Sequence, residues 1–467
     1  MINSLGTIRP QTTLLDLIAP VLIVLTGFLT PILISSSIDT WSTWVVIVLI
    51  VAMYAGCRLS LLAVNGRGRT VQLFFWIYIY FFAGLAPLAQ IGEDTWPWPS
   101  DVSESAGSTA AMVLVVTLAG YEAGRFVQSR RPVPESVRAP RELSSRRMAL
   151  VIPVAVALCL AQVLRIGPET LLSSRESIGT LIAATGGADA RASAGLSSAA
   201  LISASFVPAY LMITAKRNRI IKGWGLTSLV VICLALFASN PAASARYVTI
   251  SVWVGLLLAM LWPLTRRTFF TLALGVVLGL LVLFPALNVF RREGARSTAS
   301  DSLTGTLVQG DYDSFQQIAN TVDYVTVHGH TWGHQVLSAL LFWVPRSFWS
   351  DKGFDTGQIV AQDKGYDFTN LSAPLPAEMY IDGGFVLVAT FFVFYGAVTV
   401  WAERQAQLPL RERGFMGLLV PVFSVYQVIM LRGSLLQSMG QIMVVALILW
   451  LCTKRSMRDE EPTEPAL

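Results

Sequence analysis

Long, almost uninterrupted apolar segments recur along the chain and constrain its fold more than any other feature. About 20 apolar residues cross the hydrocarbon core of a bilayer as a helix, and twelve stretches approach or exceed that length. They lie near residues 14–35, 44–64, 72–91, 108–127, 148–165, 196–214, 224–239, 246–263, 268–290, 380–402, 414–431 and 437–453. The sequence therefore predicts an all-α, polytopic integral membrane protein of about twelve transmembrane helices.

Composition agrees with a membrane protein. Hydrophobic residues make up 54% of the 467 residues and charged residues only 13%, about half the charged share of a soluble domain. The first apolar stretch is too long for a cleavable signal core, so we expect it to be retained. All four cysteines fall in apolar stretches, where we expect no disulfide. The net charge of +5 raises the question of nucleic acid, but the positions of the charges argue against such a partner.

Basic residues gather on alternate connections between the apolar stretches. Cytoplasmic loops are enriched in Lys and Arg, so these connections predict the cytoplasmic side. They carry Arg67 and Arg69, the arginines of 130–147, Lys216 to Lys222, Arg266 and Arg267, Arg404 to Arg413, and Lys454 to Arg458. An even number of spans then places both termini in the cytoplasm of a multi-pass protein of the cell membrane.

One long polar segment, from residue 291 to residue 379, interrupts the pattern and is predicted to lie outside the cell. Its Trp, Tyr and His content favours an ordered structure over disorder. The apolar run 337–344 is too short to span and predicts a re-entrant or interfacial helix. The expected organisation is helices one to nine in 1–290, the outer loop in 291–379, helices ten to twelve in 380–453 and a cytoplasmic tail in 454–467.

Several cations fall on the side that the positive-inside rule depletes. Each could bind an acidic lipid headgroup, or several could converge on a phosphate-bearing ligand, because guanidinium forks match phosphate oxygens. The candidates for such a binding site are Arg246, Arg291, Arg292, Arg346, Lys352 and Arg432.

Acidic residues in the same region could act as a general base toward a hydroxyl group. Asp311 and Asp313 lie in GDYDSF, and Glu378 lies in SAPLPAEMYIDGG. The alternative is that each carboxylate pairs with an arginine or caps a helix. For the two aspartates we favour this structural role, whereas for Glu378 both readings stay open.

All three histidines of the chain lie in HGHTWGH, at His328, His330 and His334. No cysteine or suitably spaced acid accompanies them, so we expect no metal ion. His330 could instead donate a hydrogen bond to a polar ligand, with Trp332 as a stacking surface.

Two further patterns concern the apolar stretches. Gly275 and Gly279 form a small-xxx-small pair that indicates ordinary helix packing. The stretches contain few ionisable groups, which argues against an ion-coupled transporter.

The long polar segment resembles a known family. The stretch YDSFQQIANTVDYVTVHGHTWGHQVLSALLFWVPRSFWSDKGFDTG, followed by NLSAPLPAEMYIDGG, is similar to the outer loop of O-antigen and exopolysaccharide polymerases of the Wzy type. The segments LFFWIYIYFFAGLAPLAQ, NPAASARY and LRGSLL also resemble this group. The departure is HGHTWGH, which is richer in histidine than the family pattern.

The resemblance implies a metal-independent, all-helical glycosyltransferase without a cofactor, of the glycosyltransferase-C-like class. Such enzymes join oligosaccharide repeat units carried on undecaprenyl pyrophosphate at the outer face of the cell membrane. The partners that the resemblance implies are this lipid-linked glycan, membrane lipids and a possible chain-length regulator. It assigns Arg246, Arg291, Arg346 and Arg432 to the polymerase pattern. We expect the arginines to bind the donor pyrophosphate and to offset charge on the leaving group, with Arg346 among the catalytic residues.

Glu378 is the first choice for the base that activates the acceptor hydroxyl, and Asp313 is the second. Two alternatives stay open. One is an O-antigen ligase, which moves a finished glycan to another acceptor. The other is a lipid-linked oligosaccharide flippase or another transporter, which needs a deep polar cavity through the spans.

Overall fold

The structure, a computed structural model, describes residues 14–66, 68–132, 141–173, 188–221, 225–241, 244–283, 303–369, 371–408 and 414–455. These residues are helical almost throughout. The longer helices are α3 (Thr43–Asn65), α6 (Glu104–Arg130), α7 (Ser145–Ile166), α10 (Ala188–Arg217), α12 (Arg246–Leu261), α16 (Ser314–His328), α19 (Leu375–Gln407), α20 (Met416–Arg432) and α21 (Leu435–Leu451). The shorter ones are α1 (Leu14–Leu22), α2 (Thr30–Ile34), α4 (Thr70–Tyr78), α5 (Ala86–Gly92), α8 (Pro168–Leu172), α11 (Gly225–Ala238), α13 (Arg266–Leu278), α15 (Leu303–Leu307), α17 (His334–Leu340) and α18 (Thr356–Asp363).

Wide π-helical turns at Ile23–Leu29 and Ile79–Leu85 join α1 to α2 and α4 to α5, so each pair forms one continuous rod. A further π-helical turn, Gly279–Leu283, extends α13. The two described strands, β1 (Arg141–Leu143) and β2 (Thr453–Arg455), pair antiparallel with Arg141 opposite Arg455.

Six helical segments are long and apolar enough to cross a membrane. They are Leu15–Ser37, Thr43–Asn65, Thr70–Gly92, Glu104–Arg130, Ser145–Arg165 and Leu375–Gln407. Four shorter apolar helices accompany them, namely α11, α12, α20 and α21. Described helices also overlap every other stretch that the sequence predicts to be helical. The chain thus has the architecture of an all-α membrane protein.

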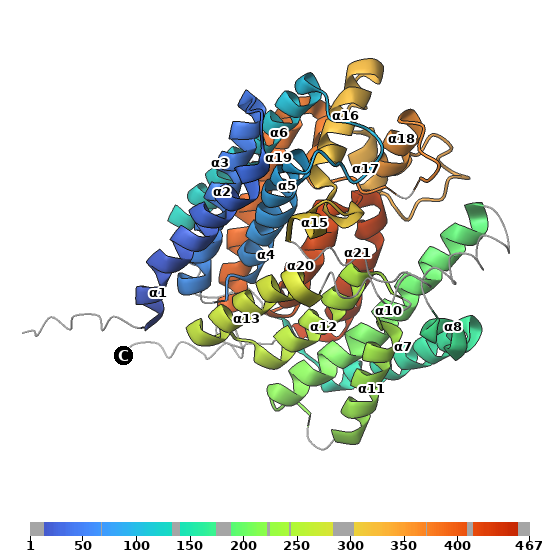
Figure 1. The fold of residues 1–467 in the computed structure, drawn as a ribbon. Coiled ribbons are helices and arrows are strands. Elements are labelled where there is room, and N and C mark those ends of the chain that lie inside the picture. The colour runs from blue at the N-terminus through green and yellow to red at the C-terminus, as the bar shows by residue number, and fades with distance from the viewer. Residues whose placement is uncertain are drawn as a thin grey trace, which may run out of the picture.

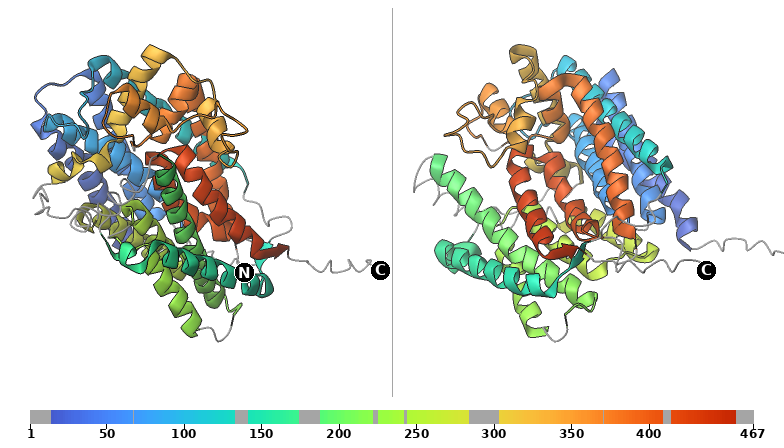
Figure 2. Two further views of the ribbon diagram at one scale, coloured as in Figure 1. Left: turned by 90° about the vertical axis from the view of Figure 1, so that its right-hand side faces the viewer. Right: turned by 180° about the vertical axis from the view of Figure 1, so that it is seen from behind.

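The helices form a bundle, and α16, α17 and α18 make up a cap at one end of it. In Figure 1, α1 to α6 run side by side with α19, while α16, α17 and α18 lie at the upper end. Figure 2 shows α7, α8, α10 and α11 gathered on one side of this bundle. The described chain begins with α1 and ends with β2, and both elements lie away from α16 to α18.

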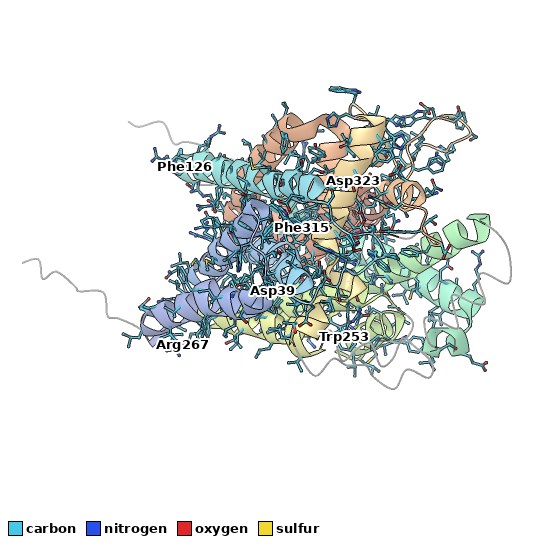
Figure 3. All side chains as sticks on the ribbon, turned by 45° about the horizontal axis from the view of Figure 1, so that its top comes forward. Asp39, Phe126, Trp253, Arg267, Phe315 and Asp323 are labelled. Carbon is cyan, nitrogen blue, oxygen red and sulfur yellow. The ribbon has the colours of Figure 1, made fainter. Side chains whose placement is uncertain are left out.

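The rod formed by α4 and α5 runs through the centre of the bundle. The most apolar part of the rod is completely buried, as expected for a helix that is apolar on every side. Phe75 on this rod stacks on Tyr121 of α6 at 3.7 Å between ring centroids. Toward the cap, Phe315 of α16 stacks on Trp44 of α3 at 5.5 Å, which ties the cap to the bundle. Figure 3 shows Phe315 among the packed helices and the half-exposed Phe126 at the periphery.

Glycines allow α6 and α19 to approach each other closely. A Cβ atom at Gly124 would lie 1.8 Å from the carbonyl oxygen of Val393, and one at Gly396 would lie 2.1 Å from that of Tyr121. Small residues at such crossings let two backbones meet. The small-xxx-small pair singled out in the sequence does not do this, because no described atom lies within 4 Å of a Cβ built at Gly275 or Gly279. Among the described residues, this pair therefore takes no part in a close helix crossing.

The membrane-length helices contain more paired ionisable groups than the sequence reading allowed. Glu122 on α6 forms ion pairs with Arg125 and with Arg58 of α3, the latter at 2.9 Å. Glu403 on α19 is buried and accepts hydrogen bonds from Gln72, at 2.9 Å from its backbone N–H and 2.6 Å from its side-chain amide. Each carboxylate has polar partners, which is what makes its burial tolerable. The scarcity of such groups therefore carries little weight against a transporter.

The first prediction concerns the contact between α6 and α19. Replacing Gly396 with alanine (Gly396→Ala) forces Cβ against the Tyr121 carbonyl, so we expect a loss of about 1–3 kcal/mol of stability. The matched control Gly275→Ala adds Cβ in open space on a helix and should leave stability unchanged or raise it by up to about 1 kcal/mol. Thermal melting of the purified protein in detergent measures both. Equal melting temperatures for the two variants would contradict the close crossing.

Candidate functional site

Most of the predicted site residues lie at the capped end of the bundle. Arg291 and Arg292 lie outside the described residues, while the other candidates are described. The described candidates other than His330 and Trp332 fall into three neighbouring groups. These groups are an arginine–aspartate cluster, a pair of buried carboxyl groups and a loop closed by Arg346 and Lys352.

Two arginines hold the short segment Gly310–Tyr312 and the aspartate that follows it. Arg246 opens α12, is only 3% exposed and forms an ion pair with Asp311. Arg432 ends α20, and its Nη2 atom lies 3.2 Å from Asp313 Oδ1 and 3.9 Å from Asp311 Oδ1. Arg432 also donates hydrogen bonds to the carbonyl oxygens of Asp311, at 2.7 Å, and Gly310, at 2.9 Å. The carboxylate of Asp311 therefore lies against both guanidinium groups.

Asp313 is completely buried and richly hydrogen bonded. Its Oδ2 atom accepts the indole N–H of Trp98 at 2.8 Å, and its Oδ1 atom accepts the hydroxyl of Ser372 at 2.7 Å and Arg432 at 3.2 Å. These donors occupy both oxygens of the carboxylate. These contacts favour a structural role for Asp313, as an anchor between the cap and the bundle.

Two residues that the sequence analysis did not single out complete this cluster. The guanidinium of Arg432 lies 4.7 Å above the ring of Tyr247, whose hydroxyl donates to the Asp311 carbonyl at 3.0 Å. Gln90 at the end of α5 donates to the carbonyl oxygens of Leu307 and Tyr312, both at 2.9 Å. The resemblance covered the segments around both residues, but no local pattern marked their side chains.

Glu378 forms the second group, in the first turn of α19. It is 3% exposed, and its Oε2 atom accepts the backbone N–H of Leu435 at 2.9 Å. The hydroxyls of Thr356 and Ser434 and the carboxyl of Asp355 lie beside it. Among the described residues, neither Glu378 nor Asp355 takes part in an ion pair. The two carboxyl groups thus lie next to each other in a buried position, and no described cation pairs with either of them.

Asp355 is the residue here that sequence reasoning missed. Burial raises the pKa of its carboxyl, although the nearby Ser434 hydroxyl and a hydrogen bond from the backbone N–H of Gly357, at 2.8 Å, partly oppose the shift. Two adjacent buried carboxyl groups disfavour a double negative charge, so one proton is readily shared between them. The arrangement can hold and move a proton.

One short turn joins the two groups. Arg432 is the last residue of α20, and Leu435 is the first residue of α21. The turn therefore carries the arginine that contacts Asp311 and Asp313 as well as the N–H and hydroxyl that lie against Glu378. A cationic site and a carboxyl pair are adjacent at one end of the bundle.

The third group closes a loop after α17. Arg346 donates to the carbonyl oxygens of Lys352 and Gly353 and lies 4.1 Å above the ring of Phe354. The Nζ atom of the buried Lys352 donates to the carbonyl oxygens of Phe342, at 2.7 Å, and Val344, at 3.0 Å. Burial, with the nearby Arg346, lowers the pKa of Lys352. Both cations therefore hold the loop that leads into Asp355. The helix predicted at 337–344 is present as α17 but ends at Leu340.

The three histidines have separate partners. His328 lies 2.8 Å from Asp363, and His334 lies 3.8 Å from Asp351. His330 packs edge-on against Trp332 and Tyr380, each at 5.6 Å between ring centroids. In the described part of the chain no three His, Cys, Asp or Glu side chains gather in a group that could hold a metal ion.

The histidine turn packs against a kink in α19. Gly384 has a φ of +59°, and a Cβ atom there would lie 3.2 Å from the His330 ring, so the position favours glycine. The buried carboxylate of Asp382 accepts the N–H groups of Gln335, at 3.1 Å, and Val336, at 2.6 Å, in the first turn of α17. An anion is stabilised at a helix N-terminus. The kink therefore fixes α17 and the exposed Trp332 above the start of α19.

The chain matches no protein-family model, no curated protein and no solved structure. The assignment of a function rests on the residues and their arrangement.

The second prediction concerns Asp355. Because burial raises its pKa above the ordinary value of 3.8, the unfolded chain loses this proton first, and Asp355 costs stability increasingly as the pH rises above that value. Replacing it with asparagine (Asp355→Asn) removes the titrating group, so the difference in melting temperature should shift in favour of the variant as the pH rises above 3.8. The exposed Asp367→Asn is the control and should show no such trend. A difference that stays constant with pH would contradict the buried, protonated carboxyl.

Proposed function

We propose that this chain is a membrane glycosyltransferase that polymerises undecaprenyl-pyrophosphate-linked oligosaccharide repeat units into a surface polysaccharide. The observation that carries the proposal is the turn after Arg432, which brings two arginines and a buried carboxyl pair together at one end of the bundle. Transfer of a glycan from a pyrophosphate needs both elements, a cationic site for the leaving group and a group that accepts a proton.

The pyrophosphate site is formed by Arg246 and Arg432. The carboxylate of Asp311 already bridges their guanidinium groups, so the spacing of the two cations fits one oxyanion. A phosphate group of the donor takes the place of that carboxylate, and its oxygens accept bidentate hydrogen bonds from the guanidinium groups. The same charges then offset the negative charge that develops on the departing pyrophosphate. Arg291, Arg292 and Arg346 are proposed to contribute to this site as the resemblance implies.

The proton is removed by Glu378. Its Oε2 atom is held by the N–H of Leu435, and it shares one proton with the adjacent Asp355. When that proton lies on Asp355, the carboxylate of Glu378 can accept another. Glu378 takes the proton of the acceptor hydroxyl as that oxygen attacks the anomeric carbon, while the bond to the pyrophosphate oxygen breaks. Asp313, whose oxygens are occupied by structural donors, is the less suitable base. His330 and Trp332 lie above the kink and are proposed to bind the glycan.

All twelve predicted helices are proposed to cross the membrane, with α16 to α18 outside the cell and both termini in the cytoplasm. In support, the described ends of the chain lie away from α16 to α18. The cap exposes large aromatic side chains, with Trp343 at 67% and Phe348 at 86%. Exposed Trp side chains are typical of a membrane–water interface, where the lipid-linked substrate has its headgroup.

The third prediction tests the base. Replacing Glu378 with glutamine (Glu378→Gln) preserves the side chain's size but removes its capacity to accept a proton, so polymerisation should fall about 10²–10⁴-fold. Extension of a purified lipid-linked repeat unit by the detergent-solubilised protein provides the measurement, and a thermal melt checks folding. Asp367→Asn changes an exposed carboxylate of the same cap and should retain full activity. Near-native extension by the glutamine variant would exclude Glu378 from the chemistry.

The fourth prediction tests the orientation. In a variant without native cysteines, Val327→Cys on the exposed face of α16 should react with a membrane-impermeant thiol reagent in intact cells. Lys216→Cys, at the far end of α10, should react only after lysis. The reverse pattern would place the cap in the cytoplasm and contradict an outer active site.

A further inference from the structure

A cavity lies at the end of the bundle opposite the candidate site. Its volume is about 360 Å³, within the range of small-molecule pockets. The ends of α10 and α12, the start of α20 and the strand pair β1–β2 surround it. Helix α20 runs from this cavity to Arg432, and its 17 residues give a separation of about 25 Å. The cavity is therefore distinct from the arginine–aspartate cluster.

Three cations and one carboxylate are among the residues that line the cavity. Arg141, Arg217 and Lys454 line the cavity. Glu142 also lines it and stands opposite Lys454 in the β1–β2 register, so one negative charge faces one positive charge. Burial lowers the pKa of Arg141, and the charges of Arg147 and Arg455 lower it further. The described residues around the cavity thus carry an excess of positive charge.

Two hydrogen-bond donors of the lining are left without an acceptor. Trp262 is only 7% exposed, and its indole N–H has no hydrogen-bond partner among the described residues. The buried hydroxyl of Thr214 also lacks one in the described part of the chain. Indole and guanidinium groups can donate but not accept hydrogen bonds. An unsatisfied buried donor is costly, so a ligand that brings acceptors would compensate for it.

We propose that this cavity binds a phosphate group at the membrane face opposite the glycosyltransferase site. A phosphate supplies negative charge and several acceptor oxygens, which match Arg217, Lys454 and the Trp262 N–H. The group belongs either to an anionic lipid headgroup of the adjoining leaflet or to a soluble phosphate compound, since both present the same oxygens. The binding site is independent of the proposed polymerase activity.

The test uses the full-length purified protein and two variants. Arg217→Gln removes a lining charge whose one described hydrogen bond, to the Leu261 carbonyl at 3.4 Å, is long. Trp262→Phe removes the indole donor but keeps an aromatic ring. The control, Arg130→Gln, removes an exposed arginine at the end of α6 that does not line the cavity. Thermal melts confirm that each variant is folded.

Two probes distinguish the sources of phosphate. Native mass spectrometry of protein released from bilayers that contain phosphatidylglycerol measures retained anionic lipid, and calorimetry with inorganic pyrophosphate measures a soluble anion. We expect one of these probes to bind about 10- to 100-fold more weakly in both cavity variants and unchanged in Arg130→Gln. If the cavity variants retain less phosphatidylglycerol, the ligand is a lipid headgroup. If they bind pyrophosphate more weakly, the ligand is a soluble phosphate compound. Equal binding of both probes by native protein and cavity variants, or no binding at all, would overturn the proposal.

Discussion

The contact between two arginines and the 310–313 segment is the interaction on which the capped end of the molecule depends. Arg246 and Arg432 come from different helices and are 3% and 16% exposed. Both lie against Asp311, and Arg432 also contacts Asp313. Removing one partner from such a buried cluster leaves a charge without compensation, at a cost of about 3–5 kcal/mol. The cluster therefore fixes the start of α12, the end of α20 and the beginning of α16 relative to one another.

The position of the proposed chemistry follows from that constraint. Once Arg432 is fixed, the residues that follow it have little freedom, and they meet Glu378 through the N–H of Leu435. The carboxyl pair is then held at a set place beside the cations, on rigid helix ends rather than on a mobile loop. Arg346 and Lys352 contribute by closing the loop that presents Asp355. Preorganisation of this kind is what an active site for group transfer requires.

Sequence reasoning could predict the helices, because their apolar stretches are long and the signal is local. It could also anticipate that Asp313 pairs with an arginine, since buried opposite charges associate. It could not find Asp355, because the contact with Glu378 depends on how the cap folds. No local sequence pattern around Asp355 or around Glu378 indicates that contact. The glycines show the same limit. Gly275 and Gly124 both lie in apolar helices, yet only Gly124 meets another backbone, and the difference arises from tertiary packing.

The most direct measurement of the central claim is deletion of the gene in its native organism, followed by sizing of the surface glycan on a gel. A polymerase account predicts that the ladder of long chains disappears while single repeat units are still exported and attached. Complete loss of lipid-linked glycan from the outer face would instead indicate a flippase. Full-length chains that remain on their lipid carrier would indicate a ligase. Either of these two results would contradict the polymerase account.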